Sequence, residues 1–149
     1  MKKVRDIMRP GFLFTVEGDA SVADAVHVMA TYDVGIVSVL EKGRLVGVFS
    51  ERDVVRRVVN EGLIPSRTRV GDVMTTSLIF ADADEDYQSA IGKMDDAGIR
   101  HLPVISQGHI LSMISIRDLL RVERKDTGEE LRYLREYLYQ VPEDTPVTP

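Results

Sequence analysis

Two short stretches of the chain repeat one spacing that can do chemistry: a serine followed three residues later by an aspartate. They are residues 50–53 (Ser-Glu-Arg-Asp) and 115–118 (Ser-Ile-Arg-Asp). At the start of a helix, unpaired backbone amides and a serine hydroxyl can donate to phosphate oxygens. A carboxylate in the same first turn can accept hydrogen bonds from both hydroxyls of a ribose. The spacing is therefore typical of a site for a nucleotide.

The same atoms also make an ordinary helix cap, which needs no ligand. A single copy would favour the cap, and we interpret the Ser-x-x-Asp at residues 21–24 in that way. Two copies, each preceded by an apolar strand, favour at least one nucleotide site. That site would use Ser50 and Asp53, or Ser115 and Asp118.

A ligand with phosphate groups needs cations beside these helix starts. Arg52 and Arg117 lie inside the two motifs, and Arg100 and His101 follow a glycine ahead of a predicted strand. Arginine suits bidentate phosphate contacts, so Arg100 is the best candidate; the alternative is that all four are solvated surface groups. The three histidines have no metal-ligand spacing, so we expect no protein metal site; Mg²⁺ would enter only with ATP.

These motifs belong to a longer internal repeat. Sliding the chain by 65 positions places residues 50, 52 and 53 on residues 115, 117 and 118 with identical residue types. Residues 4–8 resemble residues 70–74 at an offset of 66. The same 65-residue offset aligns further identical pairs, namely Ala25 with Ala90, Met29 with Met94, Val39 with Val104 and Gly43 with Gly108. The chain therefore consists of two related halves.

Each half predicts the order strand, helix, strand, strand, helix. Apolar and β-branched runs predict the strands, which are 12–16, 34–40, 45–49, 78–81, 101–105 and 110–114. Apolar stripes at helical spacing predict helices from Ser21, from Ser50 to about Glu61, from about Glu85 and from Ser115. Pro103 removes a ladder donor, so we expect its strand to be at an edge or bulged there.

The fold class is thus α+β (α/β): two β-α-β-β-α motifs packed as a pseudo-two-fold pair, plus a C-terminal helix. The predicted boundaries are 1–62 for the first motif, 63–69 for a linker, 70–125 for the second motif, 126–140 for an amphipathic helix and 141–149 for a flexible tail. A half of about 60 residues has little core of its own, so each half is expected to cover the other's apolar face.

Composition excludes several classes of function. The chain of 149 residues has a net charge of −5 and no cysteine, which excludes disulfides, thiolate metal centres and cysteine nucleophiles. No apolar run approaches the roughly 20 residues of a membrane-spanning helix, and the basic residues are scattered. We therefore expect a soluble, cytoplasmic protein with neither membrane nor nucleic acid as partner.

The ordered set of motifs resembles the CBS (cystathionine-β-synthase) domain, over about residues 1–125. In that family a glycine and two apolar residues lead into Ser or Thr, two variable residues and Asp, as at residues 47–53 and 112–118. The lead-in Val-x-Asp-x-Met at Val4 and Val70 and the segment 98–104 fit the same pattern. Two such motifs in tandem form a Bateman module.

The resemblance implies the roles of the site residues. The aspartate would hold the ribose and the serine would lie near ribose and phosphate, so Ser50 and Asp53 would serve one site and Ser115 and Asp118 the other. The second copy departs from the pattern at Ser112, which stands where the first has Gly47.

Adenine would lie in an apolar slot made by the first and second strands of the halves. The candidates in the first strands are Phe14, Thr15 and Val16 or Ile79, Phe80 and Ala81. Those in the second strands are Gly35, Ile36, Val37 and Ser38 or His101, Leu102, Pro103 and Val104. The alternative for these residues is ordinary core, and for Phe14 and Phe80 taken singly we favour that interpretation.

The resemblance implies a regulatory module that senses an adenine nucleotide or an adenine-containing cofactor: AMP, ADP, ATP, NAD or S-adenosylmethionine. It also implies a homodimer, and a separate protein that is regulated. The alternative is a structural or protein-interaction CBS dimer with empty sites. An enzyme is not expected, because the chain has no Walker loop, no Gly-x-Ser-x-Gly elbow and no clustered histidines and carboxylates.

Overall fold

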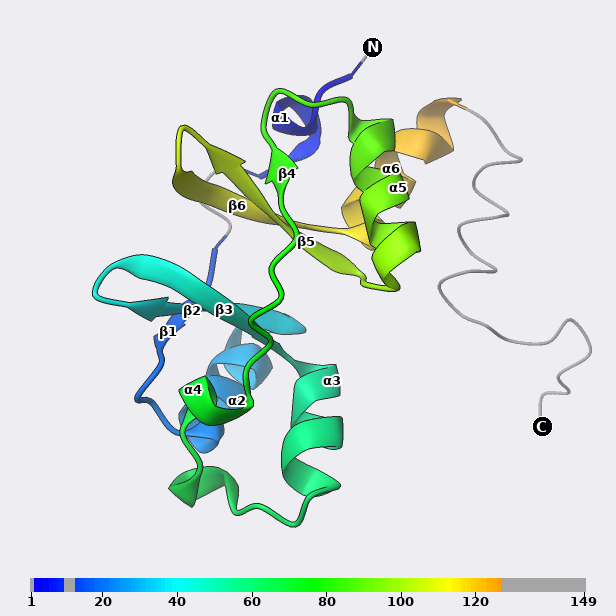
Figure 1. Ribbon diagram of the computed structural model, residues 1–149. Helices are drawn as coiled ribbons and strands as arrows, with labels where there is room; N and C mark the ends of the chain where they lie inside the picture. Colours follow the sequence, from blue (N-terminus) through cyan, green and yellow to red (C-terminus); the bar gives the residue numbers. More distant parts are fainter. Residues whose placement is uncertain (1, 10–12, 127–149) are drawn as a thin grey trace, which may run out of the picture.

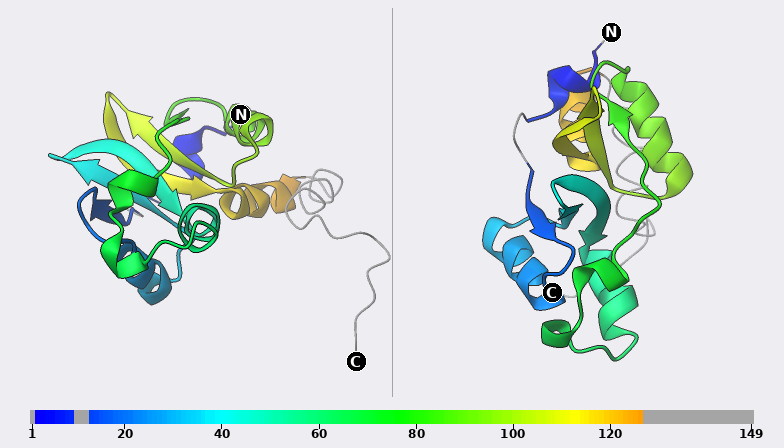
Figure 2. Two further views of the ribbon diagram at one scale, coloured as in Figure 1. Left: turned by 60° about the horizontal axis from the view of Figure 1, so that its bottom comes forward. Right: turned by 60° about the vertical axis from the view of Figure 1, so that its left-hand side comes forward.

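The computed structural model describes residues 2–9 and 13–126, which form two similar halves stacked on each other (Figure 1). Each half has a three-stranded sheet with its helices on one side, and the two sheets face each other across the middle of the molecule (Figures 1 and 2). The predicted α+β class is confirmed. The predicted C-terminal tail, and the predicted terminal helix beyond Asp126, lie outside the described residues.

The first half has the sheet order β1-β2-β3, in which β1 is parallel to β2 and β2 is antiparallel to β3. Its elements are β1 (Thr15–Glu17), α2 (Val22–Tyr32), β2 (Ile36–Glu41), β3 (Arg44–Ser50), α3 (Glu51–Asp53), the π-helix η1 (Val54–Val59) and the 3-10 turn η2 (Pro65–Arg67). The last predicted helix of this half therefore continues past Asp53 as a π-helix and not as a regular α-helix.

The second half repeats this topology. Its elements are β4 (Ala81–Asp82), α5 (Tyr87–Ala97), β5 (His101–Ser106), β6 (His109–Ser115) and α6 (Ile116–Asp126). The sheet order is β4-β5-β6, again with one parallel and one antiparallel pair. Even the register shifts correspond, at Val39/Leu40 and at Val104/Ile105. The internal repeat thus extends to the irregularities of the sheets.

The first strand of each half is shorter than predicted, and Pro103 explains part of the difference. In the first half, the Ser38 amide donates to the Phe14 carbonyl at 2.9 Å just before β1 begins. Pro103 occupies the equivalent place in β5 and has no N–H to donate to Ile79. β4 consequently pairs with β5 only at Val104 and Ile105. At Pro103, β5 has a strand neighbour on one side only, as expected for a proline in a sheet.

Each half begins with a short helix that packs on the other half. α1 (Val4–Ile7) lies against the second half, where the amides of Val4 and Arg5 donate to the carbonyls of Glu85 and Ala83 (Figure 1). α4 (Val70–Val73) lies against the first half with the equivalent bonds. The two halves therefore exchange their entry helices.

Two apolar cores result, one on the helical side of each sheet. Val4 is fully buried with Met94, Leu102 and Leu119 in the second core, and Val70 lies in the first core with Phe49. Because each core includes a residue from the other half's entry segment, neither half is complete without the other. In the part of the chain that the structure describes, no helix is long and apolar enough to cross a membrane.

Candidate functional site

Two clefts are lined by residues of both halves, and we name each for its aspartate. The Asp118 cleft has a volume of about 620 Å³ and the Asp53 cleft about 460 Å³. Each combines the Ser-x-x-Asp motif of one half with the second strand of the other half and with the segment just before its first strand. The Asp118 cleft, for example, joins Ser115 and Asp118 to Phe14 and Ser38.

The motif of the second half forms a capping box at the start of α6. The Asp118 carboxylate accepts from the Ser115 amide at 2.8 Å and from the Ser115 hydroxyl at 3.1 Å, both at Oδ2. In return, the Asp118 amide donates to the Ser115 hydroxyl at 3.3 Å. The other oxygen, Oδ1, accepts from Arg9 Nη2 at 3.3 Å. The helix cap is therefore formed, and its hydrogen bonds use only one of the two carboxylate oxygens.

The motif of the first half makes the same cap but is more fully engaged. The Asp53 carboxylate accepts from the Ser50 amide at 3.0 Å and the Ser50 hydroxyl at 3.2 Å. Thr75 Oγ1 lies 3.1 Å and 3.2 Å from the two carboxylate oxygens, and Arg57 Nε lies 3.7 Å from Oδ1. Both oxygens of Asp53 thus have donors within the protein.

Arg9 and Thr75 are equivalent residues, since each directly follows an entry helix and its Val-x-Asp-x-Met sequence. Each reaches the aspartate of the half on which that helix packs. Sequence reasoning missed both, although their shared place after the motif was a usable signal. The exchange of entry helices is what brings them to the clefts.

Gly47 and Ser112, where the second copy departs from the family pattern, hold these segments differently. A Cβ on Gly47 would lie 2.6 Å from Met74 Sδ and 2.8 Å from the Thr75 carbonyl oxygen, so only glycine fits. Ser112 is buried, and its hydroxyl donates to the Arg9 carbonyl at 2.8 Å. In the first half the segment after the entry helix is therefore held by close packing on Gly47, and in the second half by a hydrogen bond from the Ser112 side chain.

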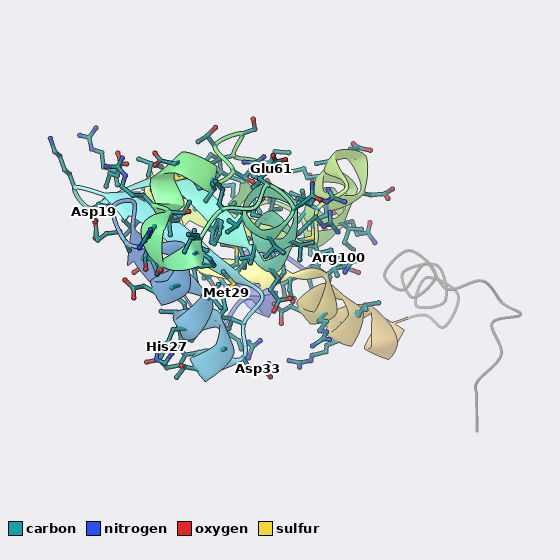
Figure 3. All side chains as sticks on the ribbon, turned by 90° about the horizontal axis from the view of Figure 1, so that it is seen from below. Asp19, His27, Met29, Asp33, Glu61 and Arg100 are labelled. Atoms are coloured by element: carbon teal, nitrogen blue, oxygen red, sulfur yellow. The ribbon has the colours of Figure 1, made fainter. Side chains whose placement is uncertain are left out.

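The two clefts meet at a shared centre, because Gly35, Ile36, Glu51, Arg100 and His101 line both. Ile36 and His101 are equivalent in the repeat, as are Gly35 and Arg100. Arg100 is exposed, and Figure 3 labels it together with Asp33, which lines the Asp118 cleft. A charged group bound at this centre would interact electrostatically with a ligand in either cleft.

Burial lowers the pKa of His101 to about 4. Nearby Arg100, Arg117 and Arg52 lower this pKa further, while the Asp118 carboxylate opposes them. His101 is therefore neutral at pH 7 and offers hydrogen bonds at the centre without a positive charge.

Positive charge exceeds negative charge in both clefts, although the chain as a whole is acidic. The Asp118 cleft has four arginines against three carboxylates; these are Arg9, Arg100, Arg117 and Arg121, with Asp33, Glu51 and Asp118. The Asp53 cleft has four arginines against two carboxylates; these are Arg52, Arg56, Arg57 and Arg100, with Glu51 and Asp53. Such a lining favours an anionic ligand.

Most of the residues predicted for the site line one or both clefts. Those that do are Phe14, Gly35, Ile36, Ser38, Ser50, Arg52, Asp53, Ile79, Arg100, His101, Pro103, Ser115, Arg117 and Asp118. Residues that line the clefts and were not proposed for the site include Arg9, Tyr32, Glu51, Thr75 and Arg121.

Seven predicted residues lie outside both clefts: Thr15, Val16, Val37, Phe80, Ala81, Leu102 and Val104. Alternation along a strand explains Val37 and Leu102, which are fully buried on the core side while their neighbours Ile36 and His101 line the clefts. Thr15 is exposed and Val16 packs against the first core. The Phe80 carbonyl accepts from Lys93 Nζ at 2.9 Å.

The described residues contain no group of three or more histidine and carboxylate side chains that could hold a metal ion. The arrangement that they do contain is a pair of acidic helix starts beside cationic walls. It can accept hydrogen bonds from sugar hydroxyls and donate to an anionic group.

Comparisons with known proteins agree with this arrangement. The model of the CBS domain matches residues 4–60 and 70–125. The CBS domain-containing protein CBSX3, mitochondrial, of Arabidopsis thaliana is 35% identical over 125 residues, which cover 80% of this chain and 61% of that protein.

Solved structures have the same fold. A CBS-domain protein from Burkholderia ambifaria MC40-6 superposes with a TM-score of 0.80 at 28% identity, covering 85% of this chain and 97% of that one. A CBS domain protein from Pyrobaculum aerophilum, solved in complex with AMP, has a TM-score of 0.72 at 22% identity and covers 89% of this chain and 96% of that one.

Proposed function

This chain belongs to the family of CBS-domain proteins, and on that premise we propose that it is a regulatory module that binds an adenine nucleotide or a related adenosine compound. The observation that carries the proposal is the pair of capped aspartates, each in a cleft whose lining has more arginines than carboxylates. The AMP complex of a protein with the same fold supports it.

The proposed roles follow from the chemistry of each group. The carboxylates of Asp53 and Asp118 accept from ribose hydroxyls, and amides of the first helical turn donate to phosphate. Arg100, exposed at the shared centre, makes charge-assisted bonds to phosphate from either cleft. His101 donates or accepts there as a neutral ring.

The charge of the clefts separates the candidate ligands. An excess of arginines favours AMP, ADP, ATP or NAD over S-adenosylmethionine, whose sulfonium is a cation. If ATP is the ligand, Mg²⁺ enters with its phosphates, because the described residues contain no cluster of metal ligands.

Occupancy of the clefts would be passed to a separate protein through a homodimer. The outer side of η1 supports this part of the proposal, because the side chains of Val55 and Val59 are 62% and 64% exposed. Exposed apolar patches of this kind mark protein interfaces. A ligand shifts such an assembly only if it binds one of its conformations better than the other.

One observation favours a second candidate, a structural or interaction module with empty sites. Ser50, Thr75 and Arg57 already supply donors to the Asp53 carboxylate, so this cleft can be explained without a ligand. The Asp118 carboxylate is less completely engaged, which is why we prefer the binding function.

Thermal unfolding of the full chain with each adenine compound distinguishes these candidates. At 100 times its Kd, a ligand raises the free energy of unfolding by about 2.7 kcal/mol. We expect a stabilisation by AMP or ATP that is lost in the double variant Asp53→Ala/Asp118→Ala. No stabilisation by any of the compounds would favour the interaction module. Unchanged ATP after prolonged incubation is the result expected for binding without catalysis.

A further inference from the structure

The internal repeat allows the two clefts to be compared residue by residue. Residues 65 positions apart occupy equivalent places, and most lining residues of one cleft have a counterpart that lines the other. Where counterparts are identical, as for Ser50 and Ser115, they serve the function common to both. Where they differ, they determine what each cleft can recognise.

The first difference is an aromatic wall. Phe14 and Tyr32 line the Asp118 cleft and stack on each other, with ring centroids 4.8 Å apart and an interplanar angle of 28°. Tyr32 is 57% exposed. Their counterparts in the Asp53 cleft are Ile79 and Ala97, which have no π-face. Stacking against a base is therefore available in the Asp118 cleft and not at the equivalent place in the other.

The second difference is a buried hydroxyl. Ser38 lines the Asp118 cleft, is fully buried, and its Oγ has no hydrogen-bond partner among the described residues. A buried polar atom without a partner costs about 1–3 kcal/mol, which a polar atom of a ligand would recover. The counterpart of Ser38 is Pro103, which offers neither a hydroxyl nor an amide.

The third difference lies at the carboxylates. Within the described residues, Oδ1 of Asp118 accepts from Arg9 alone, at 3.3 Å, and the Arg9 side chain is 53% exposed. Sugar hydroxyls can take the place of such a donor at little cost. Both oxygens of Asp53 accept from Thr75, at 3.1 and 3.2 Å. Asp118 also begins a regular helix of 11 residues, whereas α3 has only three before η1.

From these three differences we infer that the Asp118 cleft is the one that reads the adenosine part of the ligand. The base stacks on Phe14 and Tyr32, a polar atom of its edge pairs with Ser38 Oγ, and the ribose hydroxyls replace Arg9 on Asp118. The Asp53 cleft lacks the aromatic wall and the hydroxyl, so it binds adenosine compounds more weakly. This assignment rests on the proposed function.

Calorimetric titration of AMP into the full chain tests the assignment with a matched pair of variants. Asp118→Asn removes the carboxylate charge in the assigned cleft, and Asp53→Asn makes the same change in the other. We expect Asp118→Asn to weaken the tighter binding event at least tenfold, and Asp53→Asn to change it less than threefold. Equal effects, or a larger effect of Asp53→Asn, would overturn the assignment.

A second pair keeps the test decisive if Asp118→Asn impairs folding, because Asp118 also caps α6. Tyr32 is exposed, and its truncation to alanine gives the residue that its counterpart, Ala97, already is. Ile79→Ala, at the counterpart of Phe14, is the control truncation in the other cleft. We expect Tyr32→Ala to weaken the tighter binding of AMP at least fivefold and Ile79→Ala to change it less than twofold. Tight binding that is indifferent to Tyr32 overturns this inference but leaves the proposed function intact, whereas wild-type protein that binds no adenine compound overturns the proposed function itself.

Discussion

At the residue scale, burial determines the protonation of the histidine at the centre of the clefts. The pKa of His101 is lowered to about 4, against about 6.5 for a solvated histidine. Between these two values the unfolded chain binds a proton that the folded chain does not. The free energy of unfolding therefore falls as the pH drops through this window.

Replacing His101 by isoleucine, the residue at the equivalent position 36, should remove this pH dependence. Relative to the variant, the wild type should lose about 3 kcal/mol of stability in all between pH 6.5 and pH 4. Urea unfolding of both proteins at pH 7 and pH 4.5 measures the difference. Parallel losses in the two proteins would show that His101 is protonated as easily in the folded state as in the unfolded one.

A glycine position gives a second prediction at this scale. Gly47→Ala places a Cβ 2.6 Å from Met74 Sδ and 2.8 Å from the Thr75 carbonyl oxygen, so we expect a loss of about 1–3 kcal/mol. Gly92→Ala on α5 is the control, since a Cβ there meets nothing within 4 Å and alanine favours the helix. Denaturant midpoints of the two variants should move in opposite directions. A stable Gly47→Ala protein would contradict the account.

Sequence reasoning at the residue scale found the groups that form recognisable motifs. The Ser-x-x-Asp pairs, Arg100 and His101 were predicted for the site, and all of them line a cleft. Arg9 and Tyr32 were not predicted for the site, because each reaches its cleft through packing between segments that are distant in the chain. Leu102 was predicted for the site but lies outside both clefts, because a strand's pleat, and not its composition, decides which side chains face the cleft.

At the scale of elements, the exchanged entry helices join the two halves. Val4 is fully buried in the second core although it lies 77 to 115 residues before its buried neighbours there. The sequence predicted the repeated lead-in but not which half it would pack on, because the same apolar residues could complete either core.

Val4→Ala should therefore destabilise the second half more than the first. We expect a loss of about 2 kcal/mol in the free energy of unfolding, and faster amide exchange in α5 than in α2. Val26→Ala, at an exposed position of α2, is the matched control and should cost less than about 0.5 kcal/mol. Loss of protection confined to α2 would be inconsistent with the exchange of entry helices.

The order of strands and helices was predictable because apolar spacing and turn residues recur in both halves. The lengths of β1 and β4 were not predictable, since apolar residues before these strands line a cleft and lie outside the paired register. The π-helical turns of η1 have no counterpart in α6, although both follow the same motif. The runs of valines and arginines gave no indication of that difference.

At the scale of the whole molecule, the two clefts share the residues of one centre. Because Arg100 lines both clefts, Arg100→Ala should weaken the binding of AMP about tenfold or more at whichever cleft AMP occupies. Adenosine has no phosphate, so its affinity for the variant should be within about twofold of its affinity for the wild type. Titration calorimetry with both ligands measures this, with Arg44→Ala in the β2–β3 hairpin as a control. An equal loss for adenosine would mean that Arg100 does not contact phosphate.

The proposed function depends on one contact, between a sugar and a carboxylate at the start of a helix. A crystal structure of the full chain grown with saturating AMP, in a lattice that leaves both clefts open, tests that contact directly. We expect AMP in the Asp118 cleft, with its ribose hydroxyls within hydrogen-bond distance of the Asp118 carboxylate and Arg9 displaced from it. Two clefts that contain only solvent at that concentration would contradict the proposed function.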